Sequence, residues 1–214
     1  MGKTLFALAI MAATTVPAFA NSVDVKVTGT ITPDACTATL ANGGVFDYGL
    51  IKADTLATDR STDLATISSK LNITCSAPTI VVLKATSSRP DTGKPEGYPV
   101  NYIAFAEVDG MKVGGYGIYV TAPILDGAVA QVTGQYGLDA AGWGALVDGT
   151  NLSSDSTQMT RFIGFNAGSN RTPQAFSTLS VDIGINSRIN KASELDLSKD
   201  IKLDGLATIE LVYF

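Results

Sequence analysis

The two cysteines, Cys36 and Cys75, are the residues of this chain best suited to covalent chemistry. A thiol pair can form a disulfide, hold a metal ion or take part in a redox reaction, and the compartment decides among these. Residues 1–20 carry a lysine, a short apolar run and a small-x-small end, which predicts a cleaved secretory signal peptide. An even pair of cysteines in an exported chain predicts a structural disulfide in an oxidising periplasmic or extracellular environment.

The sequence contains no histidine, which is the commonest general acid or base in enzymes. This removes the Ser-His-Asp and Cys-His arrangements and the histidine-based zinc sites. Carboxylate pairs can still hydrolyse sugars, but no acidic pair stands out from the scattered aspartates. We therefore expect no catalytic residues, no metal site, no cofactor and no enzymatic activity. The net charge of −5, with basic residues placed singly, also predicts no nucleic-acid partner.

Three aromatic residues in one part of the chain are candidate ligand contacts, namely Trp143, Tyr136 and Tyr116. Exposed aromatic rings bind sugars and protein surfaces well. The competing interpretation is structural. Trp143 then anchors a glycine-rich loop to the core, and the tyrosines pack in a hairpin.

The elements that position these residues are short β-rich runs separated by clusters of Gly, Pro, Asn, Asp and Ser. No long segment has a 3.6-residue period, so the pattern predicts one all-β domain, an antiparallel β-sandwich. Alternation of Leu71, Ile73 and Cys75 places the second cysteine on a core face. Residues 87–99 predict an exposed loop, and residues 122–158 predict long loops with short edge strands. The expected strands are 23–27, 29–32, 45–48, 70–75, 80–85, 102–108, 117–121, 162–166, 179–186 and 207–213.

The last of these strands is unusual because its apolar alternation, Ile209, Leu211 and Tyr213, continues to the end of the given sequence. Termini normally fray unless another segment holds them. The pattern therefore predicts a partner that pairs with this strand.

Four landmarks follow one another along the chain. They are the signal peptide, the alternating stretch Val23-x-Val25-x-Val27 that runs into Thr28-Gly-Thr-Ile-Thr-Pro-Asp-Ala-Cys36, the sequence Phe46-Asp-Tyr-Gly49 followed by Cys75, and a terminal strand with tyrosine next to last. Together they resemble the pilin subunits of bacterial chaperone–usher fimbriae, and most closely a fimbrial-like secreted family of unknown function (family 1120 type).

The resemblance implies an immunoglobulin-like, pilin-type sandwich that is incomplete and needs a strand from another protein. A hydrophobic groove would stay open beside the C-terminal strand. The implied domain boundaries are a signal peptide at 1–20, an N-terminal extension at 21–28 and the sandwich domain at 29–214.

The resemblance also implies partners: a periplasmic pilus chaperone, an outer-membrane usher and other fimbrial subunits. Ile209, Leu211 and Tyr213 would accept the strand of the chaperone or of the next subunit, and Val23, Val25 and Val27 would act as the donor strand. The chain would pass through the periplasm to a fimbrium, to the cell surface or into the medium, and would contribute to adhesion by binding a host or glycan receptor.

The resemblance has departures, since the extension 21–28 is short for a donor strand and the domain is long for a pilin. These two departures are compatible with a minor, tip or anchor subunit of a fimbria. The alternative function is a secreted glycan-binding or protein-binding sandwich that does not polymerise.

Overall fold

The structure of the chain is a computed structural model that describes residues 36–89, 94–95, 97–99, 101–137, 142–152 and 160–214. The chain divides into two units, residues 1–33 and 34–214, and all of the described residues belong to the second. The predicted signal peptide 1–20, the extension 21–28 and the proposed donor residues Val23, Val25 and Val27 lie outside the described residues.

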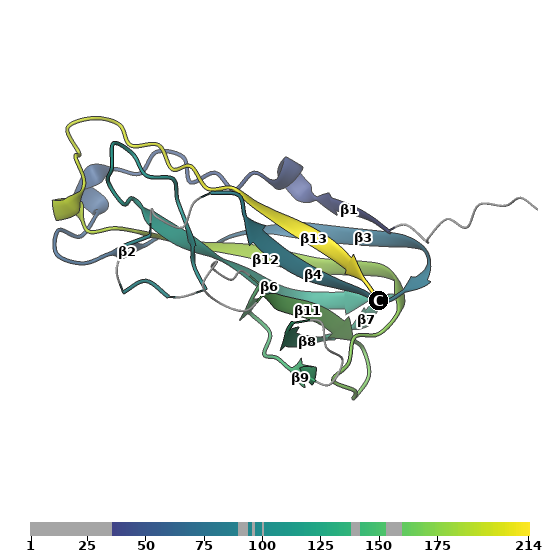
Figure 1. Cartoon of the computed structure of the whole chain (residues 1–214). Coiled ribbons are helices and arrows are strands. Elements are labelled where there is room, and N and C mark those ends of the chain that lie inside the picture. Colours follow the sequence, from purple (N-terminus) through teal and green to yellow (C-terminus); the bar gives the residue numbers. More distant parts are fainter. Residues whose placement is uncertain (1–35, 90–93, 96, 100, 138–141, 153–159) are drawn as a thin grey trace, which may run out of the picture. The chain divides into compact units, whose positions relative to one another are not determined.

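The described residues form two antiparallel β-sheets (Figure 1). The first sheet has the order β1 (Cys36–Leu40), β3 (Ile67–Thr79), β12 (Phe176–Ile189), β6 (Gly114–Leu125) and β10 (Thr150–Asn151). Three short strands flank it: β2 (Thr62–Asp63) pairs with β12, whereas β5 (Ile103–Ala104) and β7 (Ala128–Val129) pair with β6. The second sheet has the order β13 (Ala207–Tyr213), β4 (Val81–Ser87), β11 (Arg161–Asn166), β8 (Gln131–Tyr136) and β9 (Gly144–Ala145). Short 3-10 turns lie at η1 (Ala41–Gly44), η2 (Ala53–Thr55) and η5 (Ala192–Glu194).

The two sheets pack face to face because each sheet turns a row of apolar side chains toward the other. In β3 the buried positions alternate with exposed ones from Ser69 to Cys75, which is the two-residue period of a half-buried strand. Ile73 and Ile183 of the first sheet and Leu83 and Phe165 of the second belong to one buried cluster. The predicted all-β antiparallel sandwich is therefore confirmed, and so is the disulfide between Cys36 and Cys75.

The strand order has the pattern of an immunoglobulin-like sandwich with one strand unpaired. In the first sheet, β1, β3, β12 and β6 correspond to strands A, B, E and D of that fold, in the same order. In the second sheet, the neighbours β4 and β13 correspond to strands C and F. In that fold the seventh strand, G, pairs with the free edge of F. No described residue lies in a strand at this edge of β13.

Two expected strands differ in the structure. Residues 45–48 form no strand, and residues 102–108 form a ladder only over Ile103–Ala104. The structure also places β8 within residues 122–158, where we expected mostly loops. Its sequence lacks the period-two alternation that identifies a half-buried strand, because four of its six residues are buried in a row. Among the described residues, no helix has the length and apolar character needed to cross a bilayer.

Candidate functional site

Among the described residues, β13 pairs only with β4, and its outer edge is therefore a free sheet edge within this part of the chain. The Ser88 amide donates to the Leu206 carbonyl at 2.9 Å, and the Phe214 amide donates to the Ile80 carbonyl at 3.1 Å. In an antiparallel pair hydrogen-bonded residues alternate with non-bonded ones, so the even-numbered residues of β13 bond to β4. The odd-numbered residues therefore direct their N–H and C=O groups toward the free edge.

The same odd-numbered residues turn their side chains toward the core. Ile209 and Leu211 stand opposite Ala85 and Leu83 of β4. These two β4 residues are fully buried, whereas Ile209 and Leu211 are only half-buried and pack against the margin of the core. One row of residues thus offers both unpaired backbone groups and incompletely covered apolar side chains.

At Thr208 and Glu210 the even-numbered face of β13 is polar and points away from the core. Lys84 Nζ lies 2.8 Å from a carboxylate oxygen of Glu210, and the Thr86 hydroxyl donates to the other at 3.0 Å. Both interactions lower the pKa of Glu210, and the one with Lys84 has the larger effect. They hold β13 against β4 and leave its other edge untouched.

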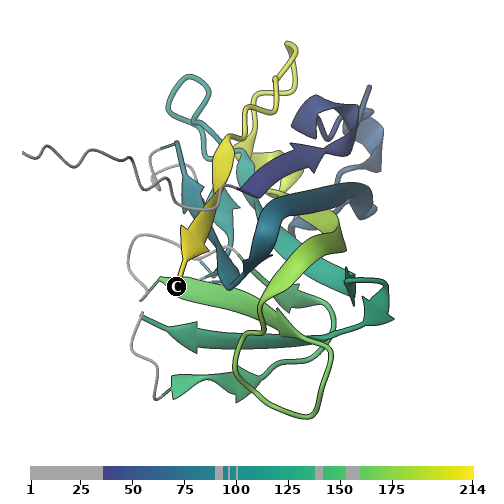
Figure 2. The same ribbon diagram turned by 90° about the vertical axis from the view of Figure 1, so that its right-hand side faces the viewer.

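The edge of β1 faces the edge of β13 across a gap, as Figures 1 and 2 both show. The Cys36 amide bonds to the Tyr213 hydroxyl and so points away from β3. By the same alternation, Ala38 and Leu40 also direct their backbone groups into the gap. Two sheet edges with unpaired backbone groups therefore line opposite sides of one opening.

Beyond β1 the wall is continued by the segment 45–51, which has no regular secondary structure. The Tyr48 hydroxyl donates to the Ile185 carbonyl of β12 at 3.0 Å, which fixes this segment to the first sheet. The Gly49 amide donates to an Asp47 carboxylate oxygen at 2.8 Å, in a turn where Gly49 has φ 60°. Glycine suits this left-handed conformation because it has no Cβ.

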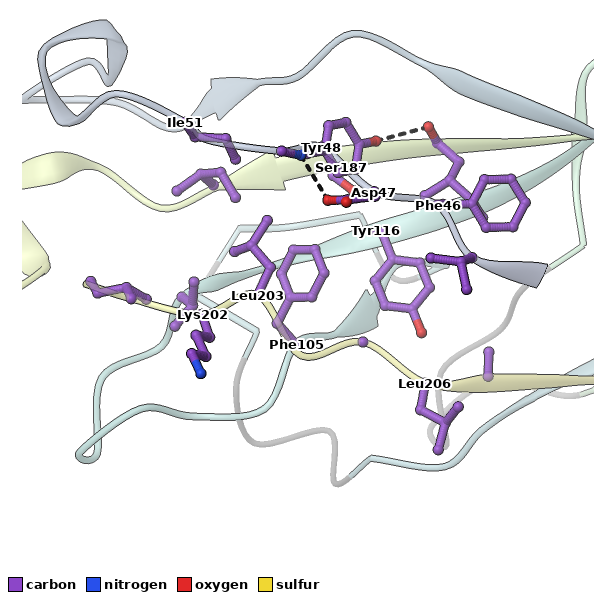
Figure 3. A pocket seen from close by; sticks show the side chains of 18 of the residues that line it. Phe46, Asp47, Tyr48, Ile51, Phe105, Tyr116, Ser187, Lys202, Leu203 and Leu206 are labelled. Atoms are coloured by element: carbon purple, nitrogen blue, oxygen red, sulfur yellow. Dashed lines mark hydrogen bonds between the residues drawn. The ribbon is translucent and has the colours of Figure 1, made fainter. Parts of the chain in front are cut away.

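Between the walls lies a groove with a volume of about 1530 Å³ (Figure 3). Its floor is the inner face of the first sheet, where Leu71, Ile118, Ile183 and Ile185 are buried. Figure 3 shows Phe46 and Tyr48 on one side of the opening and Leu203 and Leu206 on the other. The groove is therefore an apolar space between the two sheets that the described residues do not fill.

The rim of the groove exposes large apolar side chains. Leu50 is 88% exposed and Val45 is 65% exposed on one side, and Leu206 is 47% exposed on the other. Soluble proteins rarely leave a contiguous apolar strip uncovered unless another molecule binds there. At the end of the groove away from Tyr213 the lining becomes charged, with Lys52 and Lys202 on opposite sides.

Gly205 allows the segment before β13 to lie flat on two aromatic rings. A Cβ at this position would stand 2.7 Å from a Tyr116 ring carbon and 3.2 Å from the Phe105 ring. The two rings are stacked obliquely with their centroids 5.2 Å apart. Burial raises the pKa of the Tyr116 hydroxyl, so it stays protonated throughout the physiological range.

Tyr213 closes the end of the groove where β1 begins. Its hydroxyl accepts a hydrogen bond from the Cys36 amide at 3.1 Å and donates a longer one, 3.5 Å, to the Cys36 carbonyl. Cys36 is in turn tied to Cys75 of β3 by the disulfide. The three residues link the edges of the two sheets at a single level.

The proposed acceptor residues Ile209, Leu211 and Tyr213 thus lie together on one strand, beside the groove. The three proposed ligand contacts do not form one surface. Tyr116 is 5% exposed on the inner face of the first sheet, whereas Tyr136 is 53% exposed on β8 with the Arg161 guanidinium over its ring. Trp143 is half-buried just before β9, with its ring centroid 6.0 Å from that of Phe214.

Sequence patterns did not reveal the wall at 45–51 or the segment before β13. A signal for the latter was present, because the period-two pattern of β13 begins earlier, at Ile201 and Leu203. Gly205 interrupts that pattern in the sequence. In the structure it continues the row, because the aromatic rings occupy the space of its missing side chain.

Part of the chain matches one family model, and nearly all of it is similar to two proteins of Escherichia coli (strain K12). The family described as "Protein of unknown function (DUF1120)" matches residues 25–117. The "Uncharacterized protein YhcF" of Escherichia coli (strain K12) is 28% identical over 245 residues, which cover 99% of this chain and 96% of that protein. "Protein GltF" of the same organism is 28% identical over 253 residues, covering 99% and 98% respectively.

Proposed function

We propose that this protein is an exported subunit of the chaperone–usher fimbrial type, in which a β-strand from another protein completes the sandwich. The observation that supports the proposal is the free edge of β13 beside the apolar groove. A periplasmic pilus chaperone would supply the strand first. Another fimbrial subunit would then replace it at the usher.

The physical basis is β-augmentation, in which main-chain hydrogen bonds supply affinity and side-chain pockets supply specificity. Both requirements meet in the same residues, since Ile209 and Leu211 offer edge-facing backbone groups and half-buried side chains. An uncovered edge of this kind is also an aggregation hazard. A chaperone that covers it during export would remove the hazard.

The disulfide supports the export part of the proposal. Disulfides persist mainly in oxidising compartments, where a structural bond such as Cys36–Cys75 is stable. Here the disulfide links the edge strand β1 covalently to β3, next to the groove. The bond therefore stiffens one of the two edges that an incoming strand would contact.

The test is co-expression of the full chain with a periplasmic fimbrial chaperone, followed by purification through a tag on the chaperone. The wild-type chain should co-purify in a one-to-one complex. Leu211→Asp places a charge in the groove and should abolish capture. Thr208→Asp, on the outward face of the same strand, is the matched control and should leave capture intact.

Loss of capture is informative only for a folded chain, so formation of the Cys36–Cys75 disulfide and the near-ultraviolet circular dichroism spectrum are measured for each variant. Capture of folded Leu211→Asp as efficient as that of the wild type would contradict strand insertion in this groove. Failure of the wild-type chain to bind any strand donor would contradict the proposed function as a whole.

A further inference from the structure

The groove ends beside a side chain of β13, that of Tyr213. Tyr213 bonds to both the N–H and the C=O of Cys36, which are the groups that this edge residue would otherwise offer to an incoming strand. The edge of β1 is therefore satisfied at Cys36. Its next edge-facing residues, Ala38 and Leu40, form no such contact with β13.

The lining of the groove ends at the same level. Ala38 and Leu211 are the last residues of β1 and β13 that line it, and neither Cys36 nor Tyr213 contributes to its surface. The disulfide holds Cys36 to β3, so the edge that Tyr213 contacts is covalently anchored. An incoming strand would thus meet the contact between Tyr213 and Cys36 at the next odd-numbered residue of β13, two residues beyond Leu211.

We propose that Tyr213 is a register stop, a side chain that sets where the incoming strand ends and hence which of its residues enter the groove. This inference rests on the proposed function. The last inserted side chain then lies at the level of Leu211 and Ala38, and the strand pairs with the odd-numbered residues of β13 from Ala207 to Leu211. Without such a stop, a period-two apolar strand can slip by two residues and keep the same face buried.

The occupant to which we assign this register is residues 21–33 of a second copy of the chain. These residues precede the described sandwich, which begins at Cys36, and they carry Val23, Val25 and Val27 at period two. The wall of the groove runs from Ile201 to Leu211, and a fully extended chain of that many residues spans about 33 Å, the length of a strand of about ten residues. The segment 21–33 is long enough to fill it.

The experiment uses the full-length, isotope-labelled protein and an excess of a synthetic peptide with the sequence of residues 21–33, followed by amide hydrogen exchange. In the wild type, the peptide should protect the amides of Ala207, Ile209 and Leu211 and leave that of Cys36 unchanged. In Tyr213→Phe without peptide, the Cys36 amide should exchange about fivefold faster, because it loses one hydrogen bond. Peptide binding should then restore its protection.

Register is read directly from a spin label at either end of the peptide. The wild type should show one set of broadened amides, and Tyr213→Phe a second set displaced by two residues. Tyr136→Phe is the matched control, because it removes a tyrosine hydroxyl that bonds to Arg161 on the second sheet, outside the groove and away from Cys36. It should keep the single register.

The outcomes separate this inference from the function on which it rests. If the peptide binds the wild type and Tyr213→Phe retains a single register with unchanged Cys36 exchange, the register stop is wrong and strand insertion stands. If the peptide protects no odd-numbered amide of β13, the register stop and the choice of residues 21–33 as the occupant are both wrong, whereas the proposed function is decided by the co-expression with a chaperone.

Discussion

Gly205 lies against the ring of Tyr116 so closely that a Cβ on the glycine would stand 2.7 Å from a ring carbon. Tyr116 is itself packed on Phe105, so the ring has little freedom to move. Gly205→Ala should therefore lift the segment before β13 and destabilise the protein by about 1–3 kcal/mol.

Chemical denaturation compares this variant with Gly144→Ala. The nearest atom to a Cβ at Gly144 lies 4.0 Å away, so that substitution should be nearly neutral. Equal stability of the two variants would show that the contact between Gly205 and Tyr116 does not constrain the segment.

Leu83 and Leu211 are opposite each other on β4 and β13 but differ in burial. Leu83→Ala should cost about 2–5 kcal/mol, as expected for a fully buried leucine. Leu211→Ala should cost clearly less in the empty protein, because its side chain is already partly in water. Thermal unfolding with and without a strand peptide measures both, and the difference should shrink when the groove is filled. A difference that stays constant would argue against burial of Leu211 by the strand.

Proline substitution distinguishes the two edges of β13. Ala207→Pro removes an N–H that points to the free edge, so the protein should remain stable while strand binding weakens. Thr208→Pro removes an N–H that bonds to β4 and should destabilise the fold by about 1–3 kcal/mol. Denaturant midpoints and peptide titrations of both variants give the comparison. The reverse pattern would overturn the assignment of odd-numbered residues to the free edge.

The disulfide should contribute strongly to stability because it closes a long loop. The separation of 39 residues between Cys36 and Cys75 corresponds to about 4 kcal/mol in the chain-entropy model. Reduction should lower the free energy of unfolding by that order and loosen β1 first, since β1 is an edge strand. Urea unfolding with and without reductant measures the effect, and the Cys36→Ala/Cys75→Ala double variant should match the reduced protein.

Stability at high pH should depend on Tyr98. Burial, opposed by the nearby Arg188, raises the pKa of Tyr98 to about 12. The unfolded chain releases this proton near pH 10, so the stabilisation is complete below pH 10 and is lost as pH rises from about 10 to about 12. Tyrosinate absorbance and thermal unfolding followed across this range should show late ionisation. Tyr98→Phe should flatten the pH dependence, and an unchanged profile would assign it to other groups.

Local patterns predicted much of this protein. Period-two alternation at Leu71, Ile73 and Cys75 and again at Ile209 and Leu211 identified core faces correctly, because side chains alternate between the faces of any strand. The pairing of the two cysteines followed from their even number together with the predicted signal peptide, and the structure confirms it. Residues 45–48 were wrongly assigned to a strand, since a short apolar run cannot show whether a partner edge is available.

Other features depend on contacts between distant parts of the chain. Tyr213 and Cys36 are separated by 177 positions, and no local pattern links a terminal hydroxyl to the backbone of the first strand. The orientation of each N–H on β13 depends on its hydrogen-bond register with β4, which is a property of two strands together. The three aromatic candidates were also close in sequence, yet strand pairing distributes them over different faces.

The sequence by itself determined the all-β class, the disulfide and the row of apolar residues on the last strand, because each follows from residue type or from a two-residue period. Only the tertiary structure decided that this row borders a groove, that its odd-numbered residues carry the free backbone groups and that Tyr213 closes one end. These properties arise where the edges of two sheets face each other, and that relationship exists only after the sandwich has folded.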